Sequence, residues 1–185
     1  MATQSTSFSN GTPASVPTSE ADAPDVVNTL AGIAPDSPLV ALRAQRADVQ
    51  TYTQNSDAAL LNPTDVGGLS LIERHLVGLR IGTLNRNSAV ATRHREQLRA
   101  LGADAVIVTA VEAQGEITGP ERLAAILNFT DTLTHEPRAA TPAHIERLIA
   151  AGLSDKDIVT MGQLIAYFAY QVRLLAGLRI LEGAQ

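Results

Sequence analysis

Apolar residues recur at helical spacing through most of the chain after residue 36, and turn-forming residues separate the periodic segments. The pattern predicts helices over about 38–61, 71–84, 87–101, 106–111, 120–136, 142–152 and 154–180. The first ends at Asn62-Pro63, a strong helix breaker. The run 106–111 has strand propensity, but it has no second strand-like run to pair with, so we assign it to a short helix.

Several helix ends carry capping residues. Ser70 and Glu73 have capping-box spacing, Ser154 and Asp157 repeat that spacing at the start of the last helix, and Gly102 occupies a C-cap position. The connections between helices are short enough for one packed bundle. The fold class we expect is therefore all-α, with six to seven helices.

Residues 1–24 differ in composition from the rest of the chain. They are mostly Ser, Thr, Pro, Ala and Gly with one aromatic residue, Phe8, and cannot bury enough apolar surface to offset the entropy of ordering. The remainder contributes most of the 45% hydrophobic content. We therefore expect a disordered tail over 1–24 and one helical domain over 25–185.

Charge and hydropathy argue against two classes of partner. The net charge of −5 and the absence of a basic run make nucleic-acid binding an unfavourable interpretation. The first residues lack the basic and apolar regions of a secretory signal, and no stretch reaches about 18 uninterrupted apolar residues. We expect a cytoplasmic protein that does not bind membranes.

The chain contains no cysteine. Disulfides, thiolate metal sites and thiol nucleophiles all need an ionisable sulfur, so each of these chemistries is excluded. Any reaction has to be carried by other side chains.

Two segments resemble a known superfamily. The stretch LSLIERHLVGLRIGTLNRNSAVATRHREQLRALG, residues 69–102, resembles the core of the alkylhydroperoxidase D (AhpD)-like and carboxymuconolactone decarboxylase superfamily. Residues 133–178, which include Ala166, Tyr167, Phe168 and Arg173, look like the C-terminal half of its uncharacterised peroxidase-related branch. The similarity covers most of residues 36–181 and implies an AhpD-like helical bundle.

The resemblance also indicates which residues stand at the family's reactive positions. Its thiol peroxidases use a Cys pair activated by a Glu and a His, and these positions fall on Asn87, Val90, His75 and His94 respectively. Only the last, His94, keeps the family's residue type. Peroxide reduction by the thiol route is therefore excluded, since neither an amide nor an isopropyl group can form a sulfenic acid.

His75 and His94 are the catalytic candidates, because both lie on the inward side of the predicted helical hairpin. One interpretation is two packed imidazoles, hydrogen-bonded to each other or to carbonyls. The other is that they line a pocket in which Asn87 and Ser88 offer polar groups to a ligand, with His94 as general acid-base and His75 as its partner. The decarboxylase branch works without a cysteine pair, which implies acid-base chemistry on a small carboxylate or lactone.

Arginines are frequent near the hairpin. They could form a solvated face with ion pairs to Glu73, Glu96 and Glu112. Alternatively, Arg86 or Arg93 reaches the pocket and binds an anionic group, and Arg173 in the last helix is a further candidate.

We expect no metal, because two imidazoles fall short of the three protein ligands that catalytic zinc usually has, and we expect no cofactor. The sequence thus favours a cysteine-free superfamily member that binds a small organic molecule. The family implies a homo-oligomer in which the long C-terminal helix contributes to the contact. Two alternatives stay open: a non-catalytic partner subunit of an active alkylhydroperoxidase-like protein, and a peroxidase-related activity through a cofactor that the sequence does not reveal.

Overall fold

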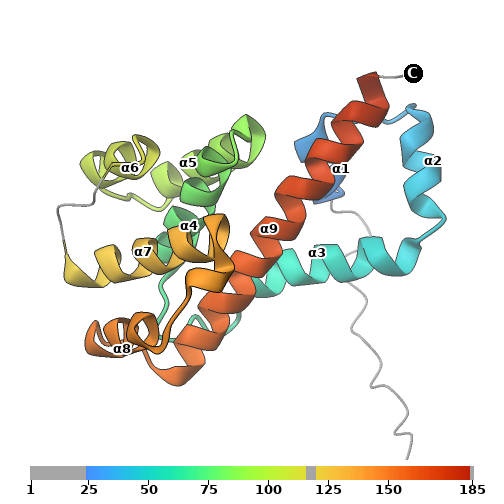
Figure 1. Ribbon diagram of the computed structural model, residues 1–185. Coiled ribbons are helices and arrows are strands. Elements are labelled where there is room, and N and C mark those ends of the chain that lie inside the picture. Colours follow the sequence, from blue (N-terminus) through green and yellow to red (C-terminus); the bar gives the residue numbers. More distant parts are fainter. Residues whose placement is uncertain (1–23, 116–119, 184–185) are drawn as a thin grey trace, which may run out of the picture.

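The computed structural model describes residues 24–115 and 120–183, and every regular element in these ranges is helical (Figure 1). The elements are α1 (Val26–Ala31), α2 (Pro38–Ala44), α3 (Ala47–Leu61), α4 (Leu71–Leu84), α5 (Ser88–Ala100), α6 (Ala105–Glu112), α7 (Glu121–His135), a 3-10 turn η1 (Pro137–Ala139), α8 (Pro142–Ala150) and α9 (Asp155–Gly183). The all-α prediction is confirmed. The predicted tail lies outside the described residues except for Pro24.

The described ranges hold nine α-helices rather than the predicted six to seven. The first additional helix is α1, which Asp25 caps and Gly32 ends with a φ of 73°. The second arises because the segment predicted as one helix bends at Arg46, where φ is −124° and ψ is 60°. An unbroken helix over 38–61 would be about 36 Å long. The bend instead turns α2 back so that Ser37 reaches Glu182 at the end of α9, 2.8 Å away.

Helix α4 forms the centre of the bundle. Every residue from Arg74 to Gly82 is buried, and α4 packs against α3, α5, α6, α7 and α9. A helix covered on all sides cannot be amphipathic, which explains the apolar run in its second half. Its position between two apolar clusters, one shared with α1 and α9 and one with α5, α6 and α7, makes it the main packing element.

Glycine allows α5 to approach α4 closely. A Cβ at Gly82 would lie 2.8 Å from the backbone nitrogen of Ala91, and a Cβ at Gly78 would lie 2.5 Å from Nε2 of His94. Both distances are shorter than van der Waals contact. The absence of side chains at these two positions therefore sets the separation of the helical hairpin.

Helix α9 runs through the molecule, with α6, α7 and α8 on one side and α2 on the other (Figure 1). Its first turn is fixed as predicted, since the hydroxyl of Ser154 donates to Asp157 at 2.6 Å and the same carboxylate accepts from the Ser154 amide. Among the described helices, α9 alone is long and apolar enough to cross a membrane. In the most apolar 18-residue window of α9, 44% of the residues are buried inside the protein.

The α4–α5 contact predicts unequal effects of adding a methyl group at two glycines. Gly82→Ala should lower the free energy of unfolding by about 2 kcal/mol, because the clash is with backbone atoms that cannot rotate away. Gly177→Ala is the control: its Cβ would meet nothing within 4 Å and lies inside α9, so it should raise stability by up to about 1 kcal/mol. Urea unfolding of both variants measures the difference, and equal effects would disprove the packing constraint.

Candidate functional site

The structure brings the two candidate imidazoles into contact. His75 on α4 and His94 on α5 face each other with their Nδ1 atoms 2.9 Å apart and their ring centroids 5.1 Å apart. His75 is 5% exposed and His94 is completely buried. His75 is therefore the less buried of the two rings.

The ring of His94 is held on both sides. It lies over the bare Cα of Gly78, and it makes a T-shaped contact with the ring of Phe168 at a centroid distance of 4.8 Å and an interplanar angle of 81°. The Nε2 atom is buried without a hydrogen-bond partner among the described residues. Since the Nδ1 contact needs one donor and one acceptor, the tautomer that leaves no buried N–H unpaired has His94 donating and His75 accepting.

Both imidazoles are neutral near pH 7. Burial, assisted by the positive charge of Arg93 and opposed by the negative charge of Asp57, lowers the pKa of His75 to about 4. Burial also lowers the pKa of His94 well below its usual value, assisted by His75 and Arg93. A neutral imidazole can donate or accept a proton at its free nitrogen, but it does not attract anions.

A cluster of hydrogen-bonded polar side chains lies beside the imidazoles, and the sequence alone did not predict that its members would come together. Asp57 on α3 is buried and receives two hydrogen bonds from Arg93, at 2.8 and 2.5 Å, and one from the hydroxyl of Tyr167 at 2.8 Å. Gln171 donates to the same hydroxyl at 3.1 Å, and its Oε1 atom is buried without a partner in the described part of the chain. Burial and the Asp57 charge raise the pKa of Tyr167, so this phenol stays protonated.

An open hollow of about 770 Å³ borders this polar group. Residues of α1, α3 and α5 and their adjoining turns line it, and the polar ones are Thr29, Gln54, Asp57, Asn62, Ser88, Thr92, Arg93 and Glu96. Neither His75 nor His94 is part of the lining. Arg93, which lines the hollow, carries the positive charge that lowers the pKa of both imidazoles.

The structure does not bring the other predicted ligand-binding residues together at one site. Ser88 lines the hollow, whereas the carboxamide of Asn87 is buried and caps α5 by accepting from the Val90 amide at 3.3 Å. Arg86 is exposed on a strained turn with a φ of 52°. Arg173 is exposed, donates to the carbonyl of Ala169 in its own helix and lies outside the lining of the hollow.

The hairpin arginines make more internal contacts than the sequence indicated. Arg80 pairs with Asp131, Arg93 with Asp57, and Arg95 with the predicted partner Glu112. Arg74 is buried and donates to the carbonyls of Leu69, Leu60 and Val66. Most of these guanidinium groups are thus occupied by the fold rather than presented to an anion.

The described residues contain no group of three or more His, Cys, Asp or Glu side chains arranged as a metal site would need. The paired imidazoles could supply at most two nitrogen ligands, and their Nδ1 atoms already face each other.

No protein-family model matches the chain, and no curated protein matches it either. Several solved structures are similar to this chain in fold. An uncharacterized peroxidase-related protein from Silicibacter sp. TM1040 is 17% identical, with a TM-score of 0.64 over 75% of this chain and 72% of that chain. A protein of unknown function from Agrobacterium tumefaciens, provisionally named an antioxidant defence protein AhpD, is 20% identical, with a TM-score of 0.64 over 76% of this chain and 92% of that chain.

A third similar structure is an alkylhydroperoxidase AhpD core, described as an uncharacterized peroxidase-related protein from Ralstonia eutropha JMP134. It is 22% identical, with a TM-score of 0.65 over 82% of this chain and 78% of that chain. Identities this low establish the fold alone. The AhpD-like fold predicted from residues 69–102 and 133–178 is therefore confirmed, and the chemistry has to be argued from this chain's own residues.

The buried imidazoles predict a specific pH dependence of stability. The pKa of His75 is lower in the folded protein than in the unfolded chain, so protons bind preferentially to the unfolded chain as the pH falls below about 6.5. Stability should be full above that pH and decline toward pH 4. Between pH 7.5 and 5, His75 should account for a loss of about 2 kcal/mol.

The variant His75→Asn isolates this contribution, because asparagine retains a hydrogen-bonding group near the Nδ1 position but does not titrate. Urea unfolding at a series of pH values should give a shallower dependence for the variant than for the unchanged protein. Identical slopes would mean that His75 is not a buried neutral imidazole.

Proposed function

We propose that this protein binds a small neutral organic molecule with a carbonyl group in the hollow between α1, α3 and α5, and that His75, which does not itself line the hollow, exchanges protons with the bound molecule through one intervening water. The observation that carries the proposal is the 2.9 Å contact between two neutral imidazoles beside the Asp57–Arg93 pair that lines the hollow. The AhpD-like fold is consistent with a reactive centre on the α4–α5 hairpin, but the ligand class follows from the charges of the lining.

The charges of the hollow favour a neutral ligand over an anion. Arg93 donates to both oxygens of Asp57, so its positive charge is compensated, and Glu96 adds a negative charge to the lining. Uncharged hydrogen-bonding groups come from Gln54 and Ser88. Of the two substrate classes considered from the sequence, a lactone fits this lining better than a carboxylate.

The imidazole chemistry fits the same class. When His94 donates to Nδ1 of His75, the other nitrogen of His75 carries its proton outward as a neutral donor. A neutral imidazole whose pKa has been lowered can polarise a carbonyl oxygen without becoming charged. In this arrangement His94 fixes the tautomer and orientation of His75, so the two residues exchange the roles predicted from the sequence.

Binding is tested with γ-valerolactone and its ring-opened form, 4-hydroxyvalerate, which differ in charge but little in size. We expect the lactone to shift the amide resonances of Ser88 and Thr92 at millimolar concentration, and the carboxylate to bind at least about tenfold more weakly. Ser88→Trp should abolish the effect by filling the hollow, whereas the exposed Ser56→Trp, outside the lining, should not. Equal binding of both compounds would refute the assignment.

Proton transfer is tested by lactone hydrolysis. If His75 reacts as a neutral imidazole with a pKa of about 4, the rate should change by less than about twofold between pH 7 and 5. An imidazole with an ordinary pKa would lose roughly thirtyfold of its neutral form over that range. His75→Gln should lose turnover while lactone binding persists.

One observation favours a second candidate, a domain that binds its ligand without chemistry or serves as a partner subunit of an active alkylhydroperoxidase-like protein. His94 is completely buried, and neither imidazole lines the hollow. Lactone binding without turnover, together with a stability loss in His94→Ala, would support this candidate over the enzyme.

We also propose a homo-oligomer, in a cytoplasmic protein, with α9 in the contact. Exposed apolar side chains on α9 include Ile180, at 73% exposure, and Val159, at 60%. Burying them against a second copy would gain about 25 cal/mol per Å². Native mass spectrometry should show an oligomer that Ile180→Glu shifts toward the monomer, and a monomeric unchanged protein would contradict the proposal.

A further inference from the structure

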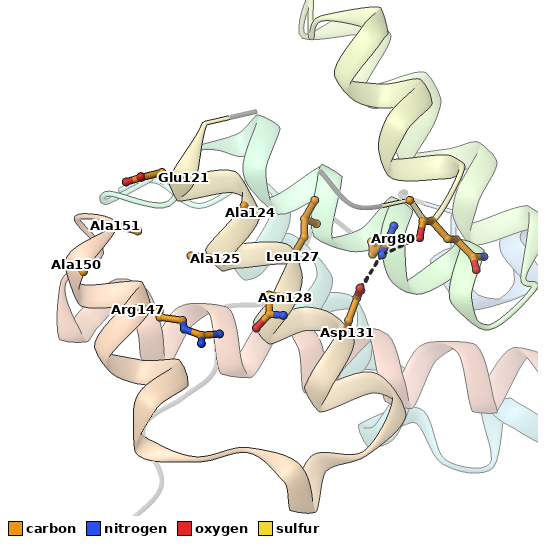
Figure 2. Close-up of a pocket in the computed structure, with 12 residues that line it drawn as sticks. Arg80, Glu121, Ala124, Ala125, Leu127, Asn128, Asp131, Arg147, Ala150 and Ala151 are labelled. Carbon is orange, nitrogen blue, oxygen red and sulfur yellow. Dashed lines mark hydrogen bonds and ion pairs between the residues drawn. The ribbon is translucent and has the colours of Figure 1, made fainter. Parts of the chain in front are cut away.

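A second hollow, of about 670 Å³, lies between α7 and α8 and shares no lining residue with the first (Figure 2). Small side chains leave the space open where the two helices face each other: Ala124 and Ala125 on α7, and Ala150 and Ala151 at the end of α8. These methyl groups and Leu127 give the hollow an apolar wall against which a compact hydrocarbon could pack.

One end of the hollow is already neutralised. The guanidinium of Arg80 binds both oxygens of Asp131, at 2.8 and 2.6 Å, and also donates to the carbonyls of Val111 and Gln114. The side chain of Arg80 is only 6% exposed. This pair is part of the wall and has no remaining charge to offer a ligand.

The other end carries an uncompensated cation. Arg147 on α8 is exposed and makes no ion pair with any residue in the described ranges. Figure 2 shows its guanidinium and the carboxamide of Asn128 extending into the same space between α7 and α8, while Glu121 points away. Asn128 lies one turn before Asp131 on α7, so its amide faces the hollow beside the neutralised pair.

We propose that this hollow binds a small organic monocarboxylate. The guanidinium of Arg147 would pair with the carboxylate, the carboxamide N–H of Asn128 would donate to it, and the hydrocarbon body would pack on the alanine wall. A single free arginine suits one carboxylate better than a multiply charged phosphate ester. A neutral molecule of the same shape would lack the main attraction.

This site is independent of the proposed function and takes the opposite charge class. The first hollow contains a compensated arginine and an additional carboxylate. The second contains a compensated arginine, the additional guanidinium of Arg147 and, at its rim, Glu121, whose side chain points away from the space in Figure 2. A carboxylate should therefore partition to the α7–α8 hollow.

The test uses benzoate, with benzyl alcohol as its uncharged analogue, on the full chain labelled with ¹⁵N. Benzoate should shift the side-chain amide of Asn128 and the backbone amides of Ala150 and Ala151, leaving Ser88 unchanged. Benzyl alcohol should bind at least about tenfold more weakly. If benzoate shifts only Ser88 and its neighbours, the carboxylate binds in the first hollow and the proposal of a site between α7 and α8 is wrong.

Two substitutions separate specific binding from general attraction to a cationic surface. Arg147→Gln should weaken benzoate binding at least about tenfold, and Asn128→Asp should weaken it comparably by placing a like charge beside the carboxylate. Both residues are exposed, so the fold should persist. Arg138→Gln, an exposed arginine outside the hollow, is the matched control and should change nothing. Equal losses in the control and Arg147→Gln would overturn the proposal.

Discussion

The close approach of α5 to α4 is the constraint on which the rest of the structure depends. Without side chains at Gly78 and Gly82, the backbone of α5 and the ring of His94 can lie directly against α4. This proximity brings His94 within hydrogen-bonding distance of His75 and removes it from water. The low pKa values follow from the same burial, so the neutral state of the imidazole pair is a consequence of helix packing.

Much of this hairpin could be predicted from sequence because it depends on local signals. The capping box at Ser70 and Glu73 fixes the start of α4, and apolar periodicity orients His75 and His94 inward, where the structure has them. Residues 69–102 likewise sufficed to predict the AhpD-like fold, because the two helices that carry the motif form its centre. Local geometry does not, however, determine how deeply each ring is buried, and His94 is completely buried whereas His75 is 5% exposed.

The parts that sequence reasoning missed depend on distant contacts. Helix α1 has only six residues, too few for periodicity to detect, yet it forms one wall of the larger hollow. The bend at Arg46 is specified by where α2 docks, near Glu182, rather than by a breaker residue. Asp57 lies in the middle of a predicted helix, and its role emerges only when α5 and α9 bring Arg93 and Tyr167 to it.

The distribution of arginines determines where this fold can bind an anion. The guanidinium groups of Arg74, Arg80 and Arg93 donate hydrogen bonds to carbonyls or carboxylates within the bundle. A buried guanidinium without such partners would be strongly destabilising. The cations nearest the imidazoles are consequently structural, which is the basis for the neutral ligand class proposed for the adjoining hollow. Attraction for a carboxylate requires a guanidinium whose hydrogen bonds the fold does not consume, and Arg147 on α8 meets that condition at the edge of a cavity. The helical core thus separates the two hollows for which we propose different ligands, whereas the sequence alone had placed the candidate residues in one pocket.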